Sequence, residues 1–116
     1  MNFLVEMKLS SSLRPMTPPE GIAFIEQVIF PTLERCKRLQ AEKRILAGGP
    51  VSGTVGLVLI VDAESAQHLD ELIATLPAWS RMETRVTPLT SFEGRSQTLA
   101  PLLQNLKTQV DAPSRG

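Results

Sequence analysis

The chain has few of the residues that support metal, redox or nucleophilic chemistry. Its 116 residues include one cysteine, one histidine, one tryptophan and no tyrosine. A single cysteine excludes an intramolecular disulfide, and one histidine with one cysteine gives no closely spaced set of metal ligands. We therefore expect no metal. Cys36 falls on an apolar helical stripe, which favours the role of a small buried hydrophobe.

An excess of one charge and a long apolar run are also absent. The 12 basic and 12 acidic side chains give a formal net charge of zero. The two signs are interspersed, so no basic patch for nucleic acid is visible. No apolar run approaches the ~20 residues that span a bilayer, and the first apolar stretch is too short and charged for a signal peptide. We expect a soluble cytoplasmic protein without nucleic-acid or membrane partners.

The apolar content that remains is sufficient for one globular domain. Hydrophobic residues make up 42% of the chain, which supports a single core but not two. We expect one domain over residues 1–110 and a frayed tail over residues 111–116. A loop rich in Ser and Pro is predicted over residues 10–19.

Hydrophobic periodicity predicts a strand and then a long helix in the first part of the chain. Residues 3–9 alternate between apolar and mixed positions, as in a strand with one buried face. Thr17 followed by two prolines and an acid is typical of a helix start. The apolar spacing then predicts a helix over residues 19–43. Pro31 costs about 3 kcal/mol inside a regular helix, so we expect a kink or a local loosening near residues 28–30.

The second part of the chain predicts three strands and two further helices. The strands are expected over residues 45–51, 54–61 and 82–89, the first two forming a hairpin, and the helices over residues 65–76 and 96–110. The resulting order, β-α-β-β-α-β-α, is the ferredoxin-like βαββαβ arrangement with one added C-terminal helix. This α+β fold has a four-stranded antiparallel sheet with two helices on one face.

One face of that sheet is left open in a single chain. The strand over residues 54–61 carries apolar side chains on both faces, and exposing them costs about 25 cal/mol per Å². We therefore expect a homodimer or a higher homo-oligomer. The last helix has an apolar stripe with few charges, which predicts docking on a neighbouring subunit.

Several segments resemble the muconolactone delta-isomerase family. They are Gly48-Gly-Pro, the apolar strand that ends in Val61-Asp62, Leu72-Ile-Ala-Thr-Leu-Pro-Ala-Trp79, and Arg85-Val-Thr-Pro-Leu89. The resemblance extends from Phe3 to about Arg95. It implies a dimeric α+β barrel, in which two ferredoxin-like sheets pack face to face. It also implies cofactor-free proton transfer that isomerises a small unsaturated lactone acid during aromatic-compound breakdown.

Strand parity selects the polar residues that could perform such chemistry. Moving a double bond beside a carbonyl needs a base and positive charge near the enolate oxygen. If the odd-numbered residues of the first strand face the helices, Glu6 and Lys8 lie on the open face, as do Arg85 and Thr87 of the last strand. The first and last strands are neighbours in this fold. In one interpretation Glu6 is the base and Arg85 is a carboxylate anchor or enolate stabiliser; in the other, the two form a structural ion pair.

The loop after the second helix offers two more candidates for substrate binding. Trp79 could form the wall of a pocket or pack at an interface, and Arg81 could bind a substrate carboxylate bidentately. His68 lies on the flank of its helix and is expected at the surface.

Two other functions fit the same scaffold. One is a non-catalytic small-ligand-binding or assembly module, since this fold carries many unrelated functions. The other is a cofactor-free monooxygenase of the same barrel superfamily, which requires a larger pocket. Convergence of Glu6, Arg85, Trp79 and Arg81 on one cavity would favour an enzyme.

Overall fold

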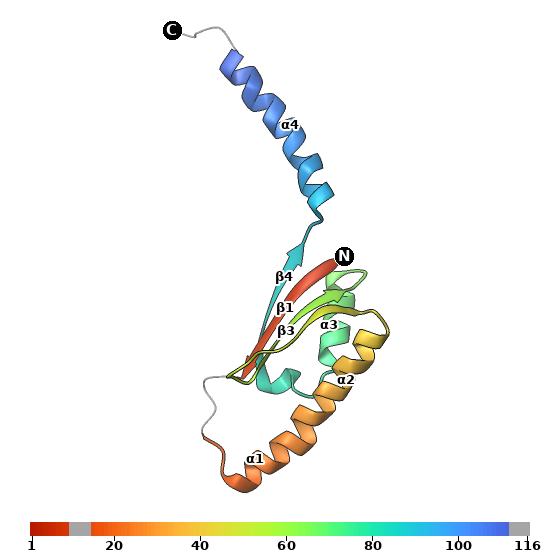
Figure 1. Cartoon of the computed structure of the whole chain (residues 1–116), viewed down its shortest axis with the longest axis vertical. Helices are drawn as coiled ribbons and strands as arrows, with labels where there is room; N and C mark the ends of the chain where they lie inside the picture. Colours follow the sequence, from red (N-terminus) through yellow and green to blue (C-terminus); the bar gives the residue numbers. More distant parts are fainter. Residues whose placement is uncertain (10–14, 112–116) are drawn as a thin grey trace.

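The computed structural model describes residues 1–9 and 15–111, so the predicted loop residues 10–14 and the tail residues 112–116 lie outside the described part. Four strands form one antiparallel sheet in the order β2-β3-β1-β4 (Figure 1). The strands are β1 (Asn2–Leu9), β2 (Ile45–Pro50), β3 (Gly56–Asp62) and β4 (Met82–Leu89). This is the predicted ferredoxin-like sheet.

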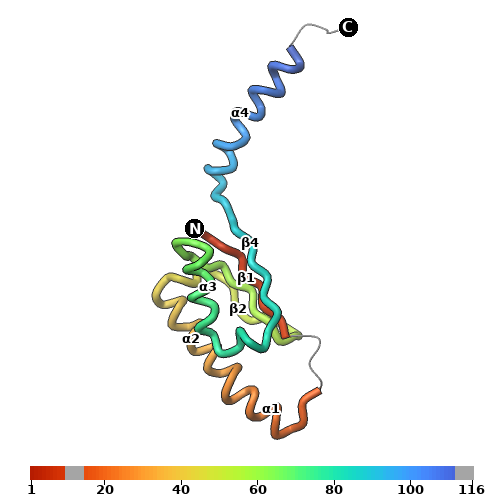
Figure 2. The backbone as a smooth tube through the Cα atoms, turned by 180° about the vertical axis from the view of Figure 1, so that it is seen from behind, coloured from red at the N-terminus to blue at the C-terminus, as the bar shows by residue number. Residues whose placement is uncertain are grey.

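Helical segments connect the strands and extend beyond the last one, and all but the short Trp79–Arg81 segment, which lies in a predicted loop, follow the predicted periodicity. They are α1 (Pro18–Phe24), the π-helix η1 (Ile25–Ile29), α2 (Phe30–Ala41), α3 (Ala66–Ala74), the 3-10 helix η2 (Trp79–Arg81) and α4 (Phe92–Asp111). Both views place α2 and α3 on the same side of the sheet (Figures 1 and 2). None of the helices in the described ranges has the length and apolar character that crossing a membrane requires.

The long helix begins at Pro18, one residue before the predicted start, and Thr17 is its cap as predicted. The Thr17 hydroxyl accepts a hydrogen bond from the Glu20 backbone N–H at 3.4 Å, and the Glu20 carboxylate accepts one from the Thr17 N–H at 3.3 Å. This reciprocal capping box satisfies two N–H groups that a helix start leaves without partners. The prolines at the first helical positions have no N–H to satisfy.

The predicted irregularity before Pro31 is a five-residue π-helix, Ile25–Ile29. Pro31 has no N–H and therefore cannot complete the regular helical hydrogen bond to Gln27. Within this segment the Phe30 N–H instead donates to the carbonyl of Ile25, one residue further back than in an α-helix. The helix thus continues through the proline without a break, with a widened turn.

The core lies between the sheet and the helices α2 and α3. Phe3, Val5 and Met7 of β1 are at most 2% exposed and pack with Leu57, Leu59 and Val61 of β3. The helices contribute Leu39, Leu69 and Ile73 to the same cluster. Cys36 packs against this core, and its burial raises the pKa of its thiol. Cys36 is thus a small hydrophobe at the edge of the core, and it is partly buried rather than fully buried as predicted.

The last helix, α4, begins four residues before the predicted start at Ser96. The Ser91 hydroxyl accepts a hydrogen bond from the Gly94 N–H at 2.9 Å and so caps a first turn that contains little apolar spacing. α4 continues away from the body of the molecule beyond β4 (Figures 1 and 2). The radius of gyration is 21.0 Å, against about 13 Å for a compact domain of this length.

Candidate functional site

The sheet face opposite the helices is open and mixes apolar with charged side chains. It carries Leu4, Glu6 and Lys8 from β1, Val58 and Ile60 from β3, and Arg85 and Thr87 from β4. These residues alternate along the strands with the buried core residues, as period two requires. In both views the helices α2 and α3 leave this face uncovered (Figures 1 and 2).

The strand register confirms that Glu6 and Arg85 are cross-strand neighbours. Glu6 lies opposite Arg85 on β4 and opposite Val58 on β3. One pair further along, Lys8 lies opposite Glu83, and the two side chains form an ion pair of 4.0 Å. Both are more than half exposed, so this pair contributes little to stability. Within the described residues, Glu6 and Arg85 form no ion pair with each other.

A hollow of about 550 Å³ lies at this charged part of the sheet, and we call it the open-face hollow. Its lining contains two acids and two bases, Glu6, Lys8, Glu83 and Arg85, together with apolar groups of β3. Three of the predicted site residues therefore share one hollow. Thr87 lies outside it, opposite Leu4, nearer the other end of β1.

Trp79 and Arg81 lie elsewhere. Both belong to η2, which precedes β4, and both side chains are exposed. The Ala78 N–H donates a hydrogen bond of 2.9 Å to the Thr32 hydroxyl and so attaches this turn to α2. Neither Trp79 nor Arg81 lines the open-face hollow. The structure therefore does not bring them together with Glu6 and Arg85, and their roles stay predictions.

His68 has a local structural role. Its Nδ1 accepts a hydrogen bond of 3.0 Å from the Glu64 backbone N–H. Its own N–H donates to the Ser65 hydroxyl, which caps α3. The ring is thus tied to the helix start and does not line the open-face hollow.

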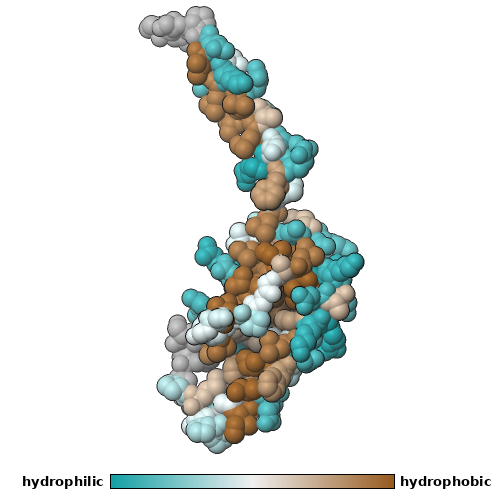
Figure 3. Space-filling view, in the orientation of Figure 1, coloured by the Kyte–Doolittle hydropathy of each residue, from teal (hydrophilic) through white to brown (hydrophobic). Residues whose placement is uncertain are grey.

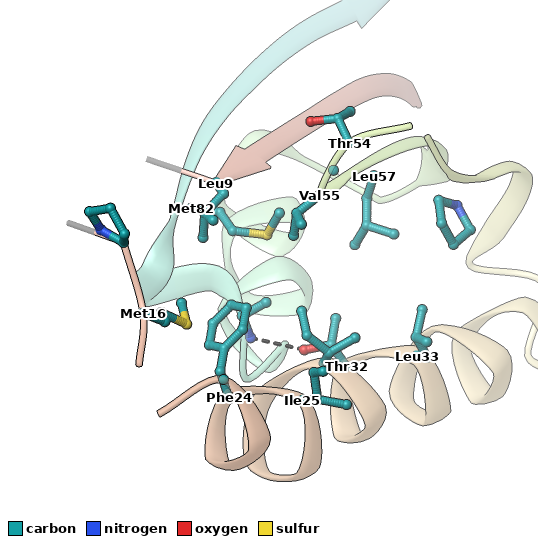
Figure 4. A pocket seen from close by; sticks show the side chains of 16 residues that line it. Leu9, Met16, Phe24, Ile25, Thr32, Leu33, Thr54, Val55, Leu57 and Met82 are labelled. Atoms are coloured by element: carbon teal, nitrogen blue, oxygen red, sulfur yellow. Dashed lines mark hydrogen bonds between the residues drawn. The ribbon is translucent and has the colours of Figure 1, made fainter. Parts of the chain in front are cut away.

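A second and larger cavity of about 660 Å³ lies between the end of the sheet and the first helical segments (Figure 4). We call it the helix-side cavity. Among the residues that the structure describes, the side chains that line it are apolar apart from Thr32 and Thr54, and none is charged. Its main apolar walls are Leu9, Phe24, Ile25, Ile29, Leu57 and Met82.

The polar groups of the helix-side cavity are few and largely occupied. The Thr32 hydroxyl is buried, donates to the Val28 carbonyl at 2.7 Å and accepts from the Ala78 N–H (Figure 4). The cavity can therefore hold an apolar or aromatic ring, and the described part of its wall supplies neither a base nor an anion anchor. Sequence reasoning missed it. The sequence pattern that could have predicted this cavity is the apolar surface of the helix from Phe24 to Leu33. That surface is wider than the stripe a helix needs to cover one face of a sheet.

The two hollows adjoin the same strand end. Thr54, Gly56 and Leu57 line both of them. A Cβ at Gly56 would lie 2.9 Å from the carbonyl oxygen of Met7, so the close approach of β1 and β3 here requires glycine.

The helix-covered antiparallel sheet places the chain in the class of ferredoxin-like α+β proteins. Within that class, the family model described as muconolactone delta-isomerase matches residues 1–94. The chain belongs to this family.

Two solved structures show the same fold. A crystal structure of muconolactone isomerase superposes with a TM-score of 0.61 at 24% identity, covering 78% of this chain and 90% of that one. The 5-chloro-2-hydroxyhydroquinone dehydrochlorinase from Burkholderia phenoliruptrix, in complex with 2,5-dihydroxybenzoquinone, has a TM-score of 0.60 at 20% identity, with 81% and 98% coverage. No curated protein matches the chain.

Proposed function

We propose that this protein is a cofactor-free isomerase of a small unsaturated lactone or a related carboxylated compound, acting in the breakdown of aromatic compounds. The observation that carries the proposal is the direct opposition of Glu6 and Arg85 inside a hollow of about 550 Å³. Membership of the muconolactone delta-isomerase family supports the reaction class.

The proposed mechanism assigns one task to each charged group. The Glu6 carboxylate removes a proton from a carbon beside the carbonyl, and its protonated form returns that proton to a more distant carbon, which shifts the double bond. Arg85 binds the substrate carboxylate or the developing enolate oxygen through its paired N–H groups. Lys8 adds a second positive charge at the same hollow.

The remaining substrate contacts are proposed from position. Thr87 lies on the same face of β4 as Arg85 and offers a hydroxyl donor toward the far end of a ligand. Trp79 and Arg81 are proposed to guide a carboxylated ring at the strand end where η2 enters β4, since Met82 pairs with Leu9 beside Lys8.

The proposed assembly is a homodimer that buries the open sheet face and forms a dimeric α+β barrel. Val58, next to Glu6, is 36% exposed in the single chain. A second copy on this face would remove water from the open-face hollow, and charges act more strongly on a substrate in such an environment.

The test is an ultraviolet assay of the purified protein with muconolactone. We expect turnover, and we expect Glu6→Gln to lower kcat by about 10² to 10⁴, the usual contribution of a general base. Arg85→Gln should mainly raise KM. The matched control is Glu71→Gln on the exposed side of α3, which should leave both constants unchanged.

Absence of turnover with muconolactone and related lactones would reject the isomerase. Turnover that survives Glu6→Gln would retain the activity but reject the open-face hollow as its site.

The helix-side cavity favours a second candidate, the binding of an aromatic ring with or without oxygen chemistry. Its volume of about 660 Å³ falls within the range of small-molecule sites, about 300–1,000 Å³. A dehydrochlorinase of the same fold was solved with 2,5-dihydroxybenzoquinone bound. This candidate includes a non-catalytic binding module and a cofactor-free monooxygenase.

Calorimetric titration with 2,5-dihydroxybenzoquinone tests the second candidate. Ile29→Trp, which fills the cavity, should abolish binding, whereas Ile22→Trp, outside the lining, should not. Oxygen uptake with an aromatic hydroquinone would identify a monooxygenase, and binding without turnover would identify a binding module. If Ile29→Trp leaves the affinity unchanged, the ring is bound elsewhere.

A further inference from the structure

The helix α4 is an addition to the family fold. It spans Phe92–Asp111, whereas the family match ends at residue 94. None of its residues is buried, and the leucines that follow Ser96 are about half exposed, as Leu103 is at 53%. In proteins, most of the stability of a helix comes from packing of its apolar face rather than from helix propensity. Its exposed apolar side chains therefore need a partner surface.

The apolar side chains of α4 form a stripe with coiled-coil spacing, in which Ser96 is the one polar member. Intervals of four and three residues alternate along the whole helix, which is the seam that pairs two helices. The seam consists of Phe92, Ser96, Leu99, Leu103, Leu106 and Val110, with Leu102 at its edge. Figure 3 shows hydrophobic residues following one side of α4.

The opposite side of α4 carries polar side chains that are suited to solvent exposure. Gln97, Thr98, Gln104, Asn105 and Thr108 occupy positions away from the seam. Pro101, which lies inside the helix, falls at the outermost position of the same repeat. There its ring does not interfere with a partner helix packed on the seam, although it removes one backbone donor.

We propose that α4 pairs in antiparallel orientation with α4 of a second copy of the chain. When the two antiparallel helices are aligned with their Pro101 residues at the same level, each seam residue faces a seam residue of the second copy. Phe92 faces Val110 of the second copy, Ser96 faces Leu106 of the second copy, and Leu99 faces Leu103 of the second copy. No seam position is left without a partner.

The charges beside the seam select this orientation. Glu93 and Lys107 flank the same edge of the helix, two heptads apart, with the small Ala100 midway between them. The antiparallel alignment places Glu93 of each chain beside Lys107 of the second copy, so two complementary pairs form. In a parallel alignment, Arg95 would meet Ala100 and Leu102 would meet Lys107, and no complementary pair forms.

Zero-length carbodiimide crosslinking of the full chain tests this pairing. In one helix, Glu93 and Lys107 are separated by about 21 Å at a rise of 1.5 Å per residue, so they cannot be linked within α4. In an equal mixture of ¹⁴N- and ¹⁵N-labelled protein, we expect a crosslinked peptide between Glu93 and Lys107. In half of these peptides, one residue should come from a ¹⁴N chain and the other from a ¹⁵N chain. Mass spectrometry identifies that peptide.

Three variants sharpen the test. Leu103→Glu, which puts charge into a central layer, should lower the crosslink yield at least tenfold. Its matched control, Gln104→Glu, adds the same charge one residue away on the solvent side and should preserve the yield. The double exchange of Glu93→Lys with Lys107→Glu should restore a reversed crosslink at a yield within twofold of the original.

Two results would overturn the proposal. One is a Glu93–Lys107 peptide that carries only one label or does not form. The other is a set of crosslinks from Lys107 to acids of the domain body, such as Glu26, which would place α4 on the helices of a neighbouring chain instead.

Discussion

At the scale of single residues, the side-chain hydroxyl of Thr84 on β4 destabilises the fold, and a single substitution can remove it. Its hydroxyl oxygen is buried and lacks a hydrogen-bond partner among the described residues. Replacing such a group by a methyl of the same shape relieves its desolvation. We expect Thr84→Val to stabilise the fold by about 1 kcal/mol, measured by chemical denaturation. Thr87→Val, on the open face, is the control and should have a smaller effect; a destabilised Thr84→Val would show that the hydroxyl is satisfied in solution.

A second residue-scale prediction concerns Glu34 on α2. The hydrogen bond of 2.8 Å from Lys37, together with its charge, lowers the pKa of the Glu34 carboxyl. Because the folded-state pKa lies below the unfolded one, the associated stability is present above the unfolded pKa and is lost as pH falls through the folded pKa. Lys37→Ala should raise the pKa of Glu34 toward its ordinary value in an NMR titration. An unchanged titration curve would mean that the ion pair does not persist in solution.

The residues of the open face could be placed from sequence because a strand has a fixed side-chain period. Once Phe3, Val5 and Met7 are assigned to the core, Glu6 must face the other way, and the known strand order brings it to Arg85. No such rule places Trp79, since a short connection between α3 and β4 has no periodicity. Its position depends on the hydrogen bond from Ala78 to Thr32, between residues 46 apart in the chain.

At the scale of elements, the β2–β3 hairpin depends on Gly48. Its φ is 105°, and a Cβ there would meet the backbone carbonyl of Val58 on the paired strand. Gly48→Ala should therefore destabilise the protein by more than about 1 kcal/mol, since a left-handed backbone alone has that cost for other residues. Gly49→Ala is the matched control, because open space surrounds its Cβ position. Equal denaturation midpoints for the two variants would contradict this account of the hairpin.

Element boundaries were predictable where the terminating residues are distinctive. Thr17 and the prolines mark the start of α1 correctly, and Pro31 predicts the irregular turn before it. The start of α4 was placed four residues late because Gly94 and Arg95 carry no apolar spacing. The helix-side cavity could not be predicted, since its shape depends on how α1 and η1 pass over the end of the sheet.

At the scale of the whole molecule, the open sheet face determines the assembly that we propose. Val58→Asp would place a charge in the apolar part of that face, next to Glu6. We expect it to weaken the sheet-to-sheet dimer at least tenfold in sedimentation equilibrium. Val86→Asp is the matched control, with 37% exposure against 36% for Val58 but on the other side of the sheet. If Val58→Asp sediments like the original protein, the open face is not the dimer interface.

The π-helix Ile25–Ile29 has a consequence for how this chain tolerates changes in length. A π turn holds one more residue than an α turn, so the segment stores a surplus residue without altering the helix ends, which remain fixed by the Thr17 cap and by Leu39 in the core. Removing one residue, such as the exposed Gln27, should convert the turn to regular helix and change the wall of the helix-side cavity. It should also lower stability by up to the roughly 3 kcal/mol that a proline costs inside a regular helix. The cavity can thus be reshaped by a single deletion while the sheet and its core keep their register.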